Sequence, residues 1–236
     1  MDLRTQLEHD VDEIVARPWN QKSGRGLPSS KHVALAGGAV ELNGAFLYAD
    51  LASSSEMVKE LDRQVAAKIL RAFHTTTARL VAASEGAVVS FDGDRVLGAF
   101  QGEARESSAV RCALHVKYAV QEIIRPRFEA QYEAVRDGSF RISHGVGIDT
   151  GTVLVVRAGA RDNDDLVWIG RAPSVASRLS YLRESPYATF VTAGVYERLE
   201  DWARLGDDGD DMWEPGAWEF LGDPMTLYRS RWLWKP

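Results

Sequence analysis

The chain has 236 residues, of which 45% are hydrophobic and 26% charged, and its formal net charge is -6. This composition predicts one compact folded unit with a sizeable core, and the acidic balance disfavours a general nucleic-acid binder. A single cysteine, Cys112, excludes a disulfide framework and a cysteine metal cluster, and we expect it to be buried. No apolar run reaches the ~18 to 20 residues of a membrane span, and the N-terminus does not resemble a signal peptide. We therefore expect a cytoplasmic protein with neither a membrane nor a nucleic acid as partner.

The first part of the chain, residues 1–43, is predicted to be an N-terminal helix followed by an extended arm. Residues 1–16 carry apolar side chains at helical spacing among charges, which predicts an amphipathic helix. Such a helix needs a surface, either on the domain or on a second copy of the chain. Residues 17–43 contain prolines and glycines with few periodic apolar positions, so we expect an irregular arm with at most short strands. The folded domain then covers residues 44–236.

Residues 45–55 combine the groups that a nucleotide site needs. A predicted strand ends here in the serine-rich start of a helix that is predicted to extend to about residue 83. Because side chains alternate along a strand, Phe46, Tyr48 and Asp50 share one face. A carboxylate for a metal, free helix amides for phosphate and aromatic rings for a base favour a nucleoside triphosphate site. The alternative is that Asp50 caps the helix while the rings fill a core.

The following elements predict an α+β fold. Two apolar segments joined by Asp92-Gly93-Asp94 predict a hairpin with Asp94 at its tip. A second long helix is predicted over residues 104–134, kinked or divided at Pro126. Residues 140–157 are predicted to form a second hairpin that turns at 150–151. The order strand, helix, hairpin, helix, strand is that of ferredoxin-like (βαββαβ) domains, so we expect a sheet with helices on one face.

The last third of the chain is predicted to contain shorter elements. Residues 157–165 and the acidic stretch 207–211 are expected to be loops. The remaining patterns predict a strand at 166–169, a helix over 172–182, a strand at 189–192, a short helix over 193–199 and a closing β-hairpin built from 218–221 and 225–234.

Four sequence blocks, at residues 46–51, 93–100, 145–151 and 169–179, occur in an order and spacing that resemble the catalytic domain of class III nucleotidyl cyclases. The resemblance covers roughly residues 44 to 230. It implies a homodimer in which each active site is shared between two chains. One chain supplies two aspartates for two divalent metal ions, and the other supplies an arginine and the groups that read the base.

Matched block by block, the resemblance assigns roles to individual residues. The metal ligands are Asp50, Asp94 and the carbonyl of Leu51, with Mn²⁺ or Mg²⁺ as the metal. Arg178 is the arginine that meets charge on the transferring phosphoryl group, and Ser174 takes the position of a transition-state asparagine. The catalytic residues implied are therefore Asp50, Asp94 and Arg178.

The departures from the family pattern concern the base. The two purine-reading positions fall on Ser90 and Val167, which cannot reproduce the purine contacts, and the late triphosphate-binding lysine has no counterpart near residues 220–222. Both metal aspartates and Arg178 are nevertheless present. This combination favours a different base over a decayed enzyme.

Residues 48–51, residues 17–21 with Gly24-Arg25, and residues 167–173 look like the pyrimidine cyclases of bacterial Pycsar antiphage systems. This resemblance implies that UTP is converted to 3′,5′-cyclic UMP and pyrophosphate, and that the cyclic nucleotide acts as a second messenger on an effector protein. A pyrimidine leaves room for larger side chains, for which Phe46, Tyr48 and Trp168 are candidates.

Three alternatives remain open at this point. CTP is the nearest rival substrate, because uracil and cytosine differ only at N3 and position 4. A purine cyclase with unusual base readers would make cyclic AMP or cyclic GMP. A non-catalytic, dimeric nucleotide-binding domain would signal without turnover.

Overall fold

The computed structural model describes residues 2–24, 26–28, 31, 33–35, 37–160 and 163–236. Arg25, one of the residues that carry the pyrimidine-cyclase resemblance, lies outside them. The chain forms two compact units. One contains residues 1–43 and 152–170, and the other contains residues 44–151 and 171–236. None of the helices in the described part of the chain is long and apolar enough to cross a lipid bilayer.

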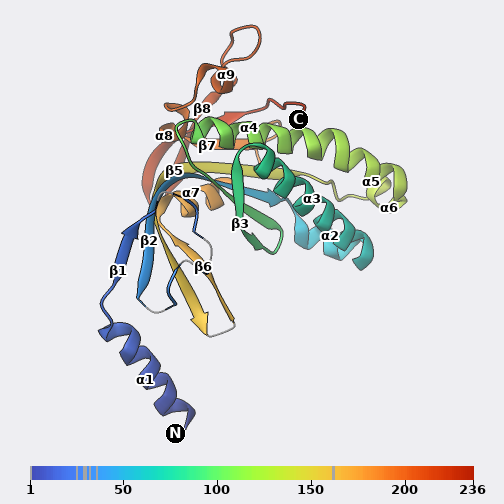
Figure 1. Cartoon of the computed structure of the whole chain (residues 1–236). Coiled ribbons are helices and arrows are strands. Elements are labelled where there is room, and N and C mark those ends of the chain that lie inside the picture. The colour runs from blue at the N-terminus through green and yellow to red at the C-terminus, as the bar shows by residue number, and fades with distance from the viewer. Residues whose placement is uncertain (1, 25, 29–30, 32, 36, 161–162) are drawn as a thin grey trace. The chain divides into compact units, whose positions relative to one another are not determined.

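The larger unit is built on a mixed sheet with the strand order β3-β4-β2-β5-β7-β9-β8. The first four positions of this order, together with the helices between the strands, are the arrangement of a ferredoxin-like domain, so the predicted α+β fold is confirmed (Figure 1). The strands are β2 (Gly38–Leu51), β3 (Gly86–Asp92), β4 (Arg95–Phe100), β5 (His144–Ala160), β7 (Thr189–Thr192), β8 (Glu214–Phe220) and β9 (Asp223–Ser230).

The main core lies between this sheet and the long helices. Alternate residues of β2 point into it, together with the buried faces of α3 and α4, which lie along the same face of the sheet (Figure 1). Cys112 is buried in α4, as expected. The helices of this layer are α2 (Ser54–Glu60), α3 (Arg63–Ala83), α4 (Arg105–Tyr118), the π-helix η2 (Ala119–Ile124), α5 (Arg125–Gln131) and α6 (Glu133–Asp137).

A smaller apolar cluster covers the opposite face of the sheet. Phe190 and Val191 are neighbours in β7, so their side chains point to opposite faces. Val191 belongs to the main core, whereas Phe190 packs with Val175 and Leu179 of α7 (Arg171–Leu179). The helix α7 is therefore the element that covers the face on which β2 carries Asp50.

The single helix predicted from residue 54 to 83 is wrong, because the chain breaks at Leu61 and Asp62. Asp62 caps the second helix by accepting a hydrogen bond from the amide of Gln64 at 2.8 Å. The residue with a left-handed backbone after α3 is Glu85, with φ 65°. The predicted division at Pro126 is confirmed, since η2 directly precedes α5 there.

The hairpin predicted to turn at residues 150–151 is also wrong. β5 runs through this point without a break for 17 residues, because the Thr150 hydroxyl is bonded to Glu106 at 2.7 Å and to the Gly44 carbonyl at 3.1 Å in the extended conformation. The antiparallel partner of β5 in this region is β6 (Asn163–Ile169), which pairs with Leu154 to Ala160 of β5. The loop predicted at 157–165 is therefore mostly strand.

The smaller unit contains the N-terminal helix and the outer ends of two strands. The helix α1 (Leu3–Ala16) is confirmed, begins with Asp2 as its cap and has no buried residue of its own. Its stripe of large apolar side chains is more than half exposed. The arm contains a short strand, β1 (Asn20–Ser23), as the prediction allowed, and this strand pairs in parallel with the start of β2, which begins at Gly38, earlier than predicted.

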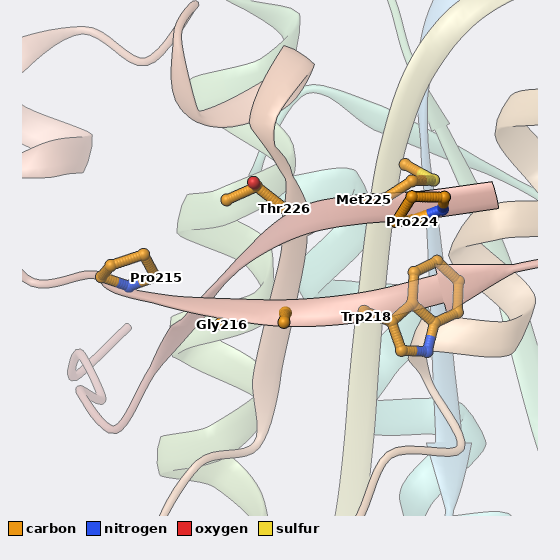
Figure 2. Close-up of a pocket in the computed structure, with 7 residues that line it drawn as sticks. Pro215, Gly216, Trp218, Pro224, Met225 and Thr226 are labelled. Atoms are coloured by element: carbon orange, nitrogen blue, oxygen red, sulfur yellow. The ribbon is translucent and has the colours of Figure 1, made fainter.

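The last part of the chain ends in the predicted hairpin of β8 and β9. Its turn is made by Leu221 and Gly222, both with positive φ. Figure 2 shows an open hollow of about 490 Å³ on this hairpin, with Trp218 of β8 beside Met225 of β9. The residues that line the hollow carry no charge, so candidate metal ligands lie elsewhere. Two short helices precede the hairpin, α8 (Ala193–Tyr196) and the unpredicted α9 (Asp201–Arg204).

Candidate active site

Asp50 lies at the buried end of β2. The positions of β2 that alternate with Asp50, such as Leu51, point into the main core. Phe46, Tyr48 and Asp50 therefore share the opposite face, as the alternation predicted. Phe46 is fully buried, Tyr48 is half-buried and the Asp50 side chain is 2% exposed. A carboxylate buried to this degree needs partners or a cation.

The structure brings Asp50 and Asp94 together. Asp94 lies in the turn between β3 and β4, and β4 pairs with β2 so that Asp50 is opposite Arg95. The backbone of Asp94 accepts a hydrogen bond from the Leu51 amide at 3.1 Å. Gly93, with φ 59°, makes the tight turn that holds Asp94 at this point. Both predicted metal aspartates and Leu51 therefore lie at one corner of the sheet.

The pKa of the Asp50 carboxyl reflects its burial and two charged neighbours. Burial raises the pKa of its carboxyl from 3.8 to about 6, the Arg183 guanidinium opposes this rise, and the charge of Asp94 adds to it. Arg183 forms an ion pair with Oδ2 of Asp50. In the described part of the chain, Oδ1 of Asp50 is buried and has no hydrogen-bond partner. One oxygen of the Asp50 carboxylate is thus available as an acceptor.

Asp50 does not cap a helix, so that part of the alternative is wrong, whereas Phe46 is buried as the alternative expected. The cap residue of α2 is Ser53, which has a left-handed backbone with φ 56° and makes no side-chain capping bond. Beside α2 lies an open hollow of about 520 Å³ with Asp94 on its wall. Its lining residues are Ser54, Ser55, Met57, Val58, Leu70, Gly93 and Asp94.

Next to the aspartates, Arg95 is enclosed by aromatic rings. Its guanidinium lies 5.5 Å from the ring centres of both Tyr48 and Tyr181, and it donates to Ser177 at 3.0 Å. It also forms an ion pair with Asp92. Burial raises the pKa of the Tyr48 hydroxyl, so this tyrosine stays neutral. Tyr48 therefore forms one wall of a cationic, ring-lined patch on the Asp50 face.

Sequence reasoning missed Arg183. It follows α7 and lies 133 residues from Asp50 along the chain, so no local pattern connects them. The one signal was Gly145 in the third sequence block. A Cβ atom there would lie 2.5 Å from Nη1 of Arg183 and 2.3 Å from the carbonyl oxygen of Ser180. Glycine at this position makes room for the arginine.

Comparison with known proteins gives full-length relatives. No family model matches the chain. It is 46% identical over 237 residues to a uridylate cyclase of Rhodovulum sp. (strain MB263), covering 100% of this chain and 99% of that protein. Uridylate cyclases of Xanthomonas perforans and Burkholderia cepacia are 36% and 35% identical, again over 99% of each protein. The chain belongs to the same family as these uridylate cyclases.

Solved structures of class III cyclases share the fold. The guanylyl cyclase Cya2 matches with a TM-score of 0.68 at 18% identity, over 83% of this chain and 95% of that one. The adenylyl cyclase CyaB from P. aeruginosa matches with a TM-score of 0.65 at 19% identity, over 81% and 95%. A class III adenylyl cyclase-like ATP-binding protein from Pseudomonas aeruginosa matches with a TM-score of 0.66 at 16% identity, over 88% and 46%.

Within this cyclase fold, Ser174 and Arg178 belong to α7. They are four residues apart on α7, so both are on its exposed face. Arg178 makes no ion pair with any residue that the structure describes, and it is not among the charges that act on Asp50. Their role in the cyclase stays a prediction that depends on a second chain.

The two positions at which the family resemblance implies base-reading residues carry small or apolar side chains. Ser90 is half-buried in β3, next to an irregularity in the pairing with β4. Val167 is 43% exposed in β6 of the smaller unit, where its neighbour Trp168 is half-buried and points to the other face of the strand. Neither Ser90 nor Val167 carries a charge.

The donor chemistry at the aspartates fits divalent cations. The described residues contain no group of three or more carboxylate, histidine or cysteine side chains that could hold a metal ion. Asp50 at the end of β2 and Asp94 in the neighbouring turn supply two carboxylates, and Oδ1 of Asp50 has no hydrogen-bond partner among the described residues. Mg²⁺ and Mn²⁺ are often bound by one or two carboxylates with the remaining positions left to substrate phosphates and water. The residues present therefore suit that type of site.

Proposed function

We propose that this class III cyclase converts UTP to 3′,5′-cyclic UMP and pyrophosphate. The observation that carries the proposal is the full-length similarity to three relatives named uridylate cyclases. The uncharged Ser90 and Val167 support it, because neither can make the purine contacts expected at those positions. The product would serve as a second messenger that activates an effector in antiphage defence.

In this proposal Asp50 and Asp94, with the carbonyl of Leu51, would hold two divalent metal ions, Mn²⁺ or Mg²⁺. The chemistry that such ions would supply is activation of the ribose 3′-hydroxyl and neutralisation of the triphosphate. Asp50 and Asp94 fix the position of that charge at the end of β2, and Phe46, Tyr48 and Ser174 contribute to nucleotide binding. Arg178 donates to the phosphoryl oxygens on which negative charge grows as pyrophosphate leaves.

The substrate is tested by competition. Purified protein with Mn²⁺ is given equal amounts of UTP, CTP, ATP and GTP, and the cyclic products are identified by mass spectrometry. The proposal expects cyclic UMP as the dominant product. Dominant cyclic CMP would make the protein a cytidylate cyclase, and dominant cyclic AMP or GMP would make it a purine cyclase; each result overturns the assignment of UTP.

The homodimer is tested by mixing two inactive variants. Asp50→Ala and Arg178→Ala each disable a different half of a shared site. In a statistical mixture half of the dimers combine the two variants, and each of these has one intact site, so about a quarter of the wild-type activity should return. No recovery at any mixing ratio would contradict shared sites.

A second candidate function is nucleotide binding without turnover. The similarity to a cyclase-like ATP-binding protein favours it. In that case Asp94→Ala would leave nucleotide binding intact and no nucleotide would be consumed by the wild type. The cyclase proposal expects wild-type turnover that Asp94→Ala abolishes while the fold, followed by circular dichroism, is retained.

A further inference from the structure

Arg183 is the only arginine among the described residues that forms an ion pair with a proposed metal ligand. Its Nη2 donates to Oδ2 of Asp50, while its Nη1 donates to the carbonyl oxygens of Ser180 at 2.5 Å and Leu182 at 2.9 Å. One edge of the guanidinium is therefore fixed by backbone, and the other edge is bonded to Asp50. The Arg183 side chain is 37% exposed, whereas that of Asp50 is 2% exposed.

The fold holds Arg183 at this position through the turn that follows α7. The amides of Ser180 and Leu182 are bonded to Ala176 and Leu179 in that turn, so the carbonyls that fix the guanidinium are themselves held. Gly145 of β5 gives the space, because a Cβ there would lie 2.5 Å from Nη1. Arg183 is thus built into the site and is not a surface arginine that meets Asp50 by chance.

We propose that Arg183 has two partners in turn. It holds the Asp50 carboxylate while no metal is bound, and it moves to the triphosphate of the substrate once metal ions occupy that carboxylate. The proposal rests on the proposed function, since it uses Asp50 as a metal ligand. It names Arg183 as a further substrate-binding residue of the site.

The exchange follows from charge. A divalent cation at Asp50 and a guanidinium on the same carboxylate repel each other, so metal binding weakens the ion pair between Arg183 and Asp50. The triphosphate that accompanies the metal offers new oxygens at the same place, and arginine binds phosphate oxygens through two parallel N–H donors. Because Nη1 stays bonded to the Ser180 and Leu182 carbonyls, only a small movement of Nη2 is needed to bring it from Asp50 to the triphosphate.

The other arginines on this face are less suited to this exchange. Arg95 is bonded to Asp92 and Ser177 and is enclosed by two rings, and its interactions do not include Asp50 as a hydrogen-bond partner. Arg178 is on the exposed face of α7 and is proposed to act in the site of a second chain. Among the described arginines, Arg183 alone combines an ion pair with Asp50 and a partly exposed side chain.

The first test measures Mn²⁺ binding by the nucleotide-free protein. The electron paramagnetic resonance signal of the free ion is used to determine how much Mn²⁺ is bound. In Arg183→Gln the competing guanidinium is gone, so Mn²⁺ should bind about fivefold more tightly than in the wild type. The titration is done at pH 8, so that Asp50 is ionised with and without its arginine. Arg183→Lys keeps the charge and should bind Mn²⁺ as the wild type does. The matched control is Arg229→Gln, which removes a different arginine, paired with the adjacent Glu184.

The second test measures how well inorganic tripolyphosphate competes with UTP for the site. Tripolyphosphate has the phosphates of UTP but no base or ribose. With saturating Mn²⁺, tripolyphosphate should compete with UTP about tenfold less well in Arg183→Gln than in wild type, and the KM for UTP should rise by a similar factor. Arg229→Gln should change neither value. Circular dichroism and the midpoint of thermal unfolding establish that each variant is folded.

Two results would overturn the proposal. Mn²⁺ affinity that is unchanged or weaker in Arg183→Gln would mean that Arg183 supports Asp50 and does not compete for it. Unchanged tripolyphosphate competition would mean that Arg183 never reaches the phosphates. A wild type that binds no Mn²⁺ and turns over no nucleotide would instead overturn the proposed function, so the two failures are distinguishable.

Discussion

Two buried aspartates on central strands of the sheet, Asp50 on β2 and Asp149 on β5, look alike at first. Each is 2% exposed and each pairs with a partly exposed arginine next to α7, Arg183 for Asp50 and Arg171 for Asp149. They differ in the second oxygen. Asp149 accepts a hydrogen bond from the Thr192 hydroxyl on Oδ1 at 2.6 Å and from Arg171 on Oδ2 at 3.0 Å, whereas Oδ1 of Asp50 has no partner among the described residues.

This difference favours Asp149 as a structural carboxylate and Asp50 as the proposed metal ligand. A buried acceptor that lacks a partner costs about 1 to 3 kcal/mol, so a fold selected for stability alone would satisfy it. Asp149 is satisfied and ties β5 to β7 and to the start of α7. Asp50 keeps an open oxygen beside Asp94, where a cation can bind. Burial and an arginine partner alone would not have distinguished the two residues.

The largest expected effect concerns turnover. Asp50→Asn keeps the shape of the side chain but removes the charge that holds metal, so kcat should fall about a thousandfold or more. Asp149→Asn is the matched control on the neighbouring strand and should retain most of the activity of folded protein. Rates of cyclic nucleotide formation with Mn²⁺ measure both. Equal losses in the two variants would mean that Asp50 has no special role.

Substitution of Asp149 should reduce stability more than substitution of Asp50, the opposite of their order for turnover. Asp149→Ala leaves the Thr192 hydroxyl and Arg171 without their partner, and we expect the free energy of unfolding to fall by about 3 kcal/mol. Asp50→Ala removes a carboxylate whose charged form is already disfavoured by burial at pH 7, so the loss should be below about 1 kcal/mol. Urea denaturation of the metal-free proteins at pH 7 compares them. A larger loss in Asp50→Ala would contradict the assignment of Asp149 as the structural residue.

Much of the fold was predictable because it depends on local patterns. The hairpin that carries Asp94 follows from its Asp-Gly turn, and the helical spacing of apolar residues indicated α1, α3 and α4. The errors occurred where a single contact overrides a local pattern. Asp62 caps a new helix inside an apolar repeat, and Thr150 is held in an extended strand at a Thr-Gly pair that is typical of a turn.

The candidate site was predictable only in part. Alternation along β2 placed Asp50 with Phe46 and Tyr48, and the Asp94 turn next to it follows from strand pairing. Arg183 was not predictable, because its contact with Asp50 depends on how the chain after α7 returns to the sheet. The open oxygen of Asp50 was also hidden, since the sequence does not show which buried acceptors are satisfied.

The pH dependence of stability gives a smaller effect with a defined sign. Because burial raises the pKa of Asp50 from 3.8 to about 6, the folded state binds this proton more tightly than the unfolded state. Its contribution to stability is therefore fully present below pH 3.8 and is lost as the pH rises through 6. Between pH 4 and pH 7.5, we expect the free energy of unfolding to fall by about 2 kcal/mol less in Asp50→Asn than in the wild type. Urea denaturation at both pH values, without metal, measures the difference; equal losses would place the pKa of Asp50 near its ordinary value.

The smallest effect comes from making Asp149 resemble Asp50. Thr192→Val keeps the size of the side chain but removes the hydroxyl that donates to Oδ1 of Asp149, so this oxygen becomes a buried acceptor like that of Asp50. We expect the free energy of unfolding at pH 7 to fall by about 1 kcal/mol, and the pKa of Asp149 to rise further, because the hydroxyl now opposes the rise caused by burial. Thr192→Ser retains the donor and should match the wild type. If Thr192→Val is as stable as Thr192→Ser, the satisfied oxygen of Asp149 contributes nothing to stability, and an open oxygen could no longer be used to tell a metal ligand from a structural aspartate in this sheet.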